Sequence, residues 1–371
     1  MERQPIQRHL EEKRAGFHEL FFDLIFVYAI QKIAHVILHT HGGTISADLF
    51  FKYIMMSLIL WILWSHQTFF TNRFGKTSKT DVCFMMFNLF VLIFLSNSLY
   101  PSFEKTFFPF FLCVTIMYMS IGLQYLVQLR YARYPNDYQT CKAFAIVAFT
   151  VAALSCLSLI LPTHIHYYSA FLGVFVAGTG LIPFRKYLYQ SPVNMMHLVE
   201  RFSLLTIIIF GEVLVGLAST FSIKHFDIIY IFQFLILVSL FGIYWLVTEN
   251  YINHQHKSIG FLLVYTHLVI NIALGMLNTA LVYSNSNELY RFFEINLLYV
   301  SIVLFLAGLW FNSSYFHAHL KIVKPIVYQI IIIIVAYMMS IVFINVGHVF
   351  VIVTAIATCL ILAIYYLKVA E

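Results

Sequence analysis

The sequence has few charged residues: aspartate, glutamate, lysine and arginine make up 10% of its 371 positions. A soluble globular domain carries roughly a quarter charged residues, because its surface must face water. Hydrophobic residues make up 61% of the chain, and its mean hydropathy is +0.85. A chain with so little charge cannot cover a water-facing exterior. We therefore expect most of its surface to face hydrocarbon.

Several functional signatures are also missing. The five cysteines form no CxxC or CxxCH motif, which disfavours a disulfide framework and haem attachment. No Walker loop, dinucleotide fingerprint, GxSxG or HExxH motif occurs. No polar stretch is long enough to fold into a soluble catalytic or nucleic-acid-binding domain. We predict no cofactor, no metal site, no catalytic residue and no nucleic-acid partner, and an enzyme is the less favoured class.

Histidine is frequent, with 16 residues, and eight of them form His-x-His pairs in loops. A metal site needs about four converging ligands. Two pairs fall on each predicted side of the membrane, so the four pairs cannot share one site. The pairs are His39/His41, His164/His166, His254/His256 and His317/His319.

Long apolar runs are what the sequence has instead. They are about 20 residues long and apolar all round, whereas a membrane β-barrel would show runs of about ten residues of alternating polarity. The predicted fold is therefore an all-α, polytopic transmembrane bundle of about twelve spans. The expected spans are 19–39, 48–70, 81–100, 106–129, 142–161, 165–183, 199–219, 227–248, 259–282, 292–311, 325–344 and 348–367.

Successive loops are alternately rich and poor in lysine and arginine. One side of the predicted membrane holds 17 of the 22, and basic loops mark the cytoplasmic side. We therefore expect both termini to be cytoplasmic. The run that begins near residue 19 contains Asp23 and Lys32 and no small-residue cleavage site, so we interpret it as a retained helix and not a signal peptide.

An internal repeat occurs at an offset of 181 residues. The less common residues that match include Glu19 with Glu200, Trp64 with Trp245, Asn72 with Asn253 and Asn97 with Asn278. Six spans form an even number, so the two halves would have the same orientation in the membrane. We predict a cytoplasmic segment 1–17, a first six-helix repeat 18–190 and a second repeat 191–371.

Ionisable residues inside the apolar runs are the candidate functional residues, because each costs at least about 2.5 kcal/mol at the centre of a span. Glu19 and Asp23 are four residues apart and share one helix face. Glu19 and Glu200 could also be simple N-terminal helix charges, satisfied by Arg14 and Arg201. We expect Asp23, one turn deeper, to be functional.

Glu212 lies deeper still, about 18 Å along its helix from Glu200. We expect it to face the bundle interior or a wet cavity. Its equivalent at the repeat offset is Gln31, and Lys32 follows at a similar depth. A Lys32–Glu212 ion pair between the two halves is one hypothesis, and a Lys32 side chain that extends to the interface is the alternative.

Two long motifs resemble the bacterial low-temperature requirement A family. The segment from His18 to Val27, HELFFDLIFV, is similar to its opening signature, and the segment from His197 to Glu212, HLVERFSLLTIIIFGE, to its second. Thr71-Asn-Arg-Phe and Tyr265-Thr-His also fit. The resemblance runs from residue 18 to about residue 315. It implies a multi-pass protein of the bacterial inner membrane required for growth in the cold, and no particular reaction.

We interpret the chain as a transporter or channel coupled to a cation or to protons, with the first and seventh spans lining the pathway. The ion-binding or proton-relay candidates are Glu19, Asp23, Glu200, Glu212, Gln31 and Lys32; gate or counter-charge candidates are Arg201, Arg73, His197, Asn72 and His267. Expected partners are membrane lipid and a small solute or ion, and assembly into a homo-oligomer is left open.

The alternatives are an intramembrane enzyme acting on lipid or isoprenoid, with Asp23, Glu200, His197 and Arg201 at the interface, and a non-transporting protein that tunes the membrane in the cold.

Overall fold

The computed structural model describes residues 13–100, 102–132, 134–286, 288–317, 320 and 323–370. Most of the predicted N-terminal segment 1–17 therefore lies outside the described residues. So do Arg3, Arg8, Arg133 and Lys321 of the basic side, the side chain of Lys368, and His319 of the last histidine pair.

The described residues form helices and no strand. Twelve helical segments are long and apolar enough to cross a membrane, which confirms the expected all-α bundle. The α-helices are α1 (Phe17–Ala34), α2 (Ala47–Phe74), α3 (Lys79–Asn97), α4 (Phe103–Leu129), α5 (Pro135–Ile160), α6 (His166–Thr179), α7 (Arg185–Gln190), α8 (Met195–Ala218), α9 (Ile229–Leu246), α10 (Phe261–Tyr283), α11 (Arg291–Phe311), α12 (Val323–Val342) and α13 (Val349–Ala370).

Local sequence explains where several helices begin and end. Ser46, Ser78 and Asn194 each accept a backbone N–H of the first turn of the helix that follows, which is the usual role of such N-cap residues. The sixth span is interrupted after Thr179, and a short 3-10 turn that contains Pro183 precedes α7. Proline lacks the N–H that a continuous helix needs, so the span is two helices and not one.

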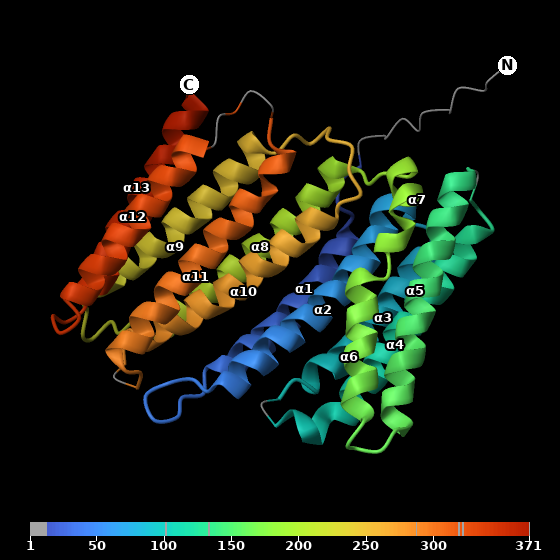
Figure 1. Cartoon of the computed structure of the whole chain (residues 1–371), viewed down its shortest axis with the longest axis horizontal. Helices are drawn as coiled ribbons and strands as arrows, with labels where there is room; N and C mark the ends of the chain where they lie inside the picture. Colours follow the sequence, from blue (N-terminus) through green and yellow to red (C-terminus); the bar gives the residue numbers. More distant parts are fainter. Residues whose placement is uncertain are drawn as a thin grey trace.

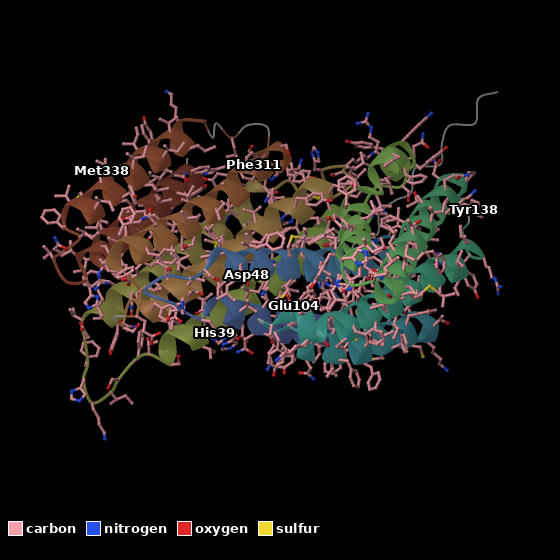
Figure 2. All side chains as sticks on the ribbon, turned by 60° about the horizontal axis from the view of Figure 1, so that its bottom comes forward. His39, Asp48, Glu104, Tyr138, Phe311 and Met338 are labelled. Carbon is pink, nitrogen blue, oxygen red and sulfur yellow. The ribbon has the colours of Figure 1, made fainter. Side chains whose placement is uncertain are left out.

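The helices form two groups that lie side by side (Figure 1), with α1–α7 in one group and α8–α13 in the other. The side chains on the outside are largely apolar: Phe311 and Met338, labelled in Figure 2, are 68% and 56% exposed. Such large exposed apolar side chains suit a bilayer and not water. The ends of α1 and α2 near His39 and Asp48 lie opposite the end where α13 terminates (Figures 1 and 2).

The helix order of the two groups corresponds at the offset of 181 residues. At this offset each of the helices α1–α6 corresponds in sequence to one of α8–α13, in the same order, and α7 is an additional short helix at the end of the first group. In both groups the first helix contacts the second and third, and the fifth contacts the fourth and sixth. The duplication and the boundary near residue 190 stay predictions.

The two groups meet where α1 and α2 contact α8 and α10. Gly275 of α10 makes a close approach possible there: a Cβ at this position would overlap the hydroxyl oxygen of Tyr53 on α2 and lie 3.1 Å from its Cζ atom. That hydroxyl donates a hydrogen bond of 2.8 Å to the Ile272 carbonyl oxygen. Glycine at 275 therefore allows α2 to bond to the backbone of the other group.

We expect Gly275→Ala to destabilise the protein by about 1–3 kcal/mol, because the added methyl group displaces the Tyr53 hydroxyl. In the double variant Gly275→Ala with Tyr53→Phe the overlapping oxygen is gone, so the two effects should not add. Unfolding of the purified protein in detergent, followed by circular dichroism, measures both. A double variant whose loss equals the sum of the single losses contradicts this account of the contact.

Candidate functional site

A buried polar cluster joins α1, α2 and α8. We call the α1–α8 cluster the set Glu19, Asp23, Trp64, His197 and Arg201. These side chains come from helix positions that share a face: Glu19 and Asp23 are four residues apart on α1, and His197 and Arg201 are four apart on α8. None of the five residues is more than 2% exposed.

Asp23 and Arg201 form the centre of this cluster. The guanidinium binds the carboxylate through one edge at two points: Nη2 lies 2.5 Å from Oδ1 and Nε lies 2.9 Å from Oδ2. The indole N–H of Trp64 donates to the same Oδ1 at 2.7 Å. Two-point contact of this kind is the strong, directional form of the arginine–carboxylate interaction. It fixes α1 against α8 and aligns both with α2.

Glu19 makes the second carboxylate contact of Arg201. Its Oε2 atom lies 3.2 Å from Arg201 Nη1 and 2.9 Å from His197 Nε2. The same atom accepts the backbone N–H of Gly16. Arg14 is not its partner, so the simple pairing of Glu19 with the nearest basic residue in sequence is wrong. The glutamate of α1 is held by α8.

Hydrogen bonding by Asn72 sets the protonation of His197. Asn72 Oδ1 accepts the backbone N–H of Asn194, so its amide nitrogen faces the other way and donates to the Asn194 carbonyl oxygen and to His197 Nδ1, at 2.9 and 3.0 Å. An imidazole nitrogen that accepts carries no proton. The ring proton of His197 is therefore on Nε2, where it is donated to Glu19, and the ring is neutral.

The protonation of His197 can be measured directly. In ¹⁵N spectra of histidine-labelled protein in micelles, we expect Nδ1 of His197 to give the signal of an unprotonated nitrogen and Nε2 that of a protonated one. In Asn72→Asp the side chain can only accept, so Nδ1 should gain a proton. The His197→Gln spectrum assigns the signals. A protonated Nδ1 in the unchanged protein contradicts the assignment.

Two further basic residues hold α2 beside the cluster. Lys13 donates to the carbonyl oxygens of Thr71 and Gly75, the latter at 2.8 Å, which is a favourable position for a cation at a helix C-terminus. Arg73 donates to the carbonyl oxygens of Ser191 and Ile259, each at 3.1 Å, and its guanidinium lies over the ring of Phe69. Arg73 thus connects α2 to the loops that flank α8 and α10.

His267 lies close to the cluster without being part of it. Its Nδ1 donates to the Leu263 carbonyl oxygen, so Nε2 is the acceptor for the hydroxyl of Tyr244 at 3.1 Å. Its ring contacts Phe202, which stands edge-on to Trp64. Aromatic rings therefore separate His267 from the charged groups.

Glu200 is not in the cluster. Its Oε2 accepts the backbone N–H of Ala15 at 3.0 Å, and the side chain lines an open cleft between α8 and α9. The grouping of Glu200 with Asp23, His197 and Arg201 in one interfacial site is therefore wrong. Glu200 lies about 100° round α8 from Arg201, and its side chain lines the cleft on the α9 side.

The Lys32–Glu212 ion pair is not formed. The ammonium of Lys32 lies 5.4 Å from the centroid of the Tyr28 ring, and Glu212 is partly exposed. In the part of the chain that the structure describes, the side chains of Glu212 and Gln31 make no hydrogen bond. Lys32 is nine residues after Asp23, which at about 100° per residue places it half a turn away from the face that meets α8.

Sequence reasoning did not assign a role to Trp64, Thr71 or Asn194. A signal was present: Trp64, Thr71 and Asn72 are spaced by seven and eight residues and share one face of α2. Thr71 accepts from Arg201 Nη1 at 3.4 Å. That spacing, combined with Trp64 being one of four tryptophans, could have placed α2 against the acids of α1.

Comparison with known proteins identifies the family of the chain. A family model described as "Bacterial low temperature requirement A protein (LtrA)" matches residues 14–365. No curated protein matches the chain. The matched region includes every residue of the α1–α8 cluster, eleven of the twelve membrane-type helices and nearly all of the twelfth. The chain therefore belongs to the LtrA family and is a multi-pass membrane protein.

Proposed function

We propose that this LtrA protein is a proton-coupled transporter in which the α1–α8 cluster binds the proton. The observation that carries the proposal concerns the contact between α1 and α8. Every hydrogen bond and ion pair recorded between the described residues of these two helices ends on the carboxylate of Glu19 or Asp23. The polar connection between α1 and α8 therefore depends on the charge of two acids, whereas the bonds of Tyr53, Asn72 and Arg73 across the two groups do not.

The charges in the cluster do not balance. Two carboxylates face one guanidinium, and His197 is neutral because of its bond from Asn72. An excess carboxylate among the five residues of the cluster is costly in a low-dielectric interior, and the ammonium of Lys13, which acts on Glu19 from outside the cluster, offsets part of that cost. Uptake of one proton removes the excess. The cluster thus has the composition of a site that exchanges a single proton.

Glu19 is the acid best placed to take that proton. Both oxygens of Asp23 are held by N–H donors, whereas among the described residues the contacts of Glu19 all end on Oε2. A proton on Oε1 of Glu19 cancels its attraction to Arg201 and leaves Asp23 to neutralise the guanidinium. Because α1 and α8 belong to different groups of helices, this weakening favours movement of one group against the other, as in transporters built from two like-oriented halves.

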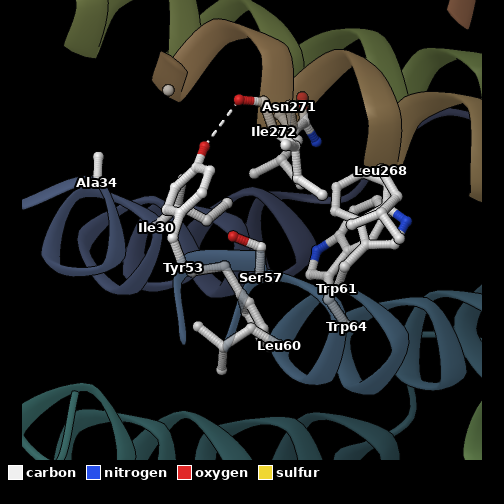
Figure 3. Close-up of a pocket in the computed structure, with 13 residues that line it drawn as sticks. Ile30, Ala34, Tyr53, Ser57, Leu60, Trp61, Trp64, Leu268, Asn271 and Ile272 are labelled. Atoms are coloured by element: carbon white, nitrogen blue, oxygen red, sulfur yellow. Dashed lines mark hydrogen bonds between the residues drawn. The ribbon is translucent and has the colours of Figure 1, made fainter. Parts of the chain in front are cut away.

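The contact region continues beyond Trp64, away from the end of the bundle where α13 terminates. A cavity of about 30 Å³ lies there. Figure 3 shows residues that line it, among them Trp61, Trp64, Tyr53 and Asn271. This volume holds about one water molecule. Asn271 is 7% exposed, and within the described residues neither atom of its amide has a hydrogen-bond partner. The amide of Asn271 can therefore bind a water molecule or a solute where the two groups of helices meet.

In this proposal Asn72 and Arg73 stabilise the closed state. Glu212 and Gln31 lie deeper on α8 and α1, and Lys32 has no part in the pathway, because it lies on the face of α1 that is turned away from α8. An enzyme acting on lipid is less well supported, because catalytic acids must touch their substrate and those of the cluster are at most 2% exposed.

Sealed vesicles test the proposal. Purified protein is reconstituted into liposomes that contain a pH-sensitive dye, and an inward proton gradient is imposed in the presence of panels of cations and small organic solutes. We expect proton entry to depend on one class of solute and to exceed that of protein-free vesicles. Turnover of an added lipid without any solute-dependent proton movement contradicts transport and favours the enzyme.

A further inference from the structure

A second polar site lies between α8 and α9, outside the α1–α8 cluster. It is an open cleft of about 360 Å³, here named the α8–α9 cleft, at the end of α8 that is nearest to Arg14. The residues used below are Arg14, Glu200, Ile207, Phe241, Trp245 and Glu249, all of which line it. None of the proposed transport steps uses this cleft.

One part of the cleft is apolar and open to the outside. Ile207, Phe241 and Trp245 are 44%, 37% and 55% exposed. Ile207 is about 10 Å further along α8 than Glu200, at 1.5 Å per residue. Exposed tryptophan beside aliphatic side chains is typical of the boundary between headgroups and acyl chains. This wall therefore suits a hydrocarbon chain that enters from the bilayer.

The other part of the cleft is charged. Glu200 contributes a carboxylate whose Oε2 accepts from Ala15, and no hydrogen bond of its Oε1 is recorded among the described residues. Glu249 lies in the π-helical turn Val247–Tyr251 that ends α9, and is exposed. Such π turns are frequent at functional sites. Arg14 adds one guanidinium, so two carboxylates face one positive charge.

The two halves of the sequence differ at this place. Trp245 and Glu200 correspond to Trp64 and Glu19 at the offset of 181 residues. In the first half the tryptophan is 0% exposed and donates to Asp23, and the glutamate is bound by α8. In the second half Leu204 stands in the position of Asp23, and Trp245 is half exposed. The space beside the tryptophan and the glutamate is occupied by protein side chains in the first half and is open in the second half.

We propose that the α8–α9 cleft binds a phospholipid whose headgroup carries a primary ammonium. The ammonium is placed between Glu200 and Glu249, the phosphate near Arg14, and an acyl chain along Ile207, Phe241 and Trp245. A primary ammonium donates hydrogen bonds to both carboxylates, whereas a trimethylated headgroup has no N–H to donate. A headgroup with net negative charge is repelled, because carboxylates outnumber the guanidinium.

Quenching of Trp245 fluorescence tests the site. The protein is reconstituted into phosphatidylcholine vesicles that contain a minor fraction of either phosphatidylethanolamine or phosphatidylcholine with brominated acyl chains. Trp245→Phe supplies the background of the other three tryptophans. We expect brominated phosphatidylethanolamine to quench Trp245 with about fivefold stronger apparent binding than brominated phosphatidylcholine, because only the primary ammonium can donate hydrogen bonds to the carboxylates.

The double variant Glu200→Gln with Glu249→Gln should lose this preference. Glu104→Gln, which changes an exposed acid at the start of α4, should keep it. Unchanged emission from the other tryptophans shows that the variants are folded. Equal quenching by the two lipids, stronger quenching by brominated phosphatidylglycerol, or a preference that survives in the double variant overturns the proposal. None of these outcomes bears on proton transport.

Discussion

Replacing Arg201 with methionine should lower the free energy of unfolding by about 3–5 kcal/mol. The change removes the only guanidinium of the α1–α8 cluster and leaves Glu19 and Asp23 buried without their shared partner. Methionine has a comparable chain length, so packing against Trp64 is largely kept. Denaturant-induced unfolding of the purified protein in micelles measures the loss.

A matched control uses the ion pair between Lys52 and Asp48. This pair lies within α2, and the side chain of Asp48 is 65% exposed. Exposed pairs of this type contribute about 0–1 kcal/mol, so Lys52→Met should change stability little. A loss in Arg201→Met no larger than in Lys52→Met contradicts the view that Arg201 holds α1 to α8.

A double variant separates lost attraction from uncompensated charge. In the double variant Arg201→Met with Asp23→Asn, one of the two acids that lose Arg201 is replaced by a neutral side chain, and only Glu19 stays charged. We expect this protein to be more stable than Arg201→Met alone, because the cost of leaving a buried acid unpaired is reduced. If Asp23→Asn instead adds to the damage, the main contribution of Asp23 lies in its bond with Trp64.

Asp23→Asn should abolish solute-dependent proton entry into proteoliposomes. The asparagine can still accept from Trp64, but it cannot neutralise Arg201, so the guanidinium depends on Glu19 alone. Glu19 then stays ionised and cannot exchange its proton. We expect the rate to fall to that of protein-free vesicles, whereas folding and yield are retained.

Asp48→Asn is the control for this experiment, since it removes an acid of the same type from the opposite, exposed end of α2. It should transport like the unchanged protein. Glu19→Gln, which mimics a permanently protonated acid, should also lose coupled proton entry while it still allows the two groups of helices to move. Coupled transport that persists in Asp23→Asn contradicts a proton site in the α1–α8 cluster.

The sequence predicted the site only in part. The shared face of Glu19 and Asp23 follows from their spacing, and the resemblance drew attention to His197, Arg201 and Asn72. The grouping of Glu200 with them and the Lys32–Glu212 pair were wrong. In both cases the prediction considered position along the membrane axis, whereas contacts also depend on how each helix is rotated. Lys32 lies half a turn away from the face of α1 that meets α8.

The sequence by itself determined the class of the protein, its twelve spans and its membership in the LtrA family, which the described helices and the family match confirm. These properties are encoded locally, because apolar length alone decides whether a segment can cross a bilayer. Only the tertiary structure decided that Arg201 binds two acids 178 and 182 residues away, and that the open cleft lies between α8 and α9. Such contacts depend on the packing and rotation of helices from both groups, which no local pattern specifies.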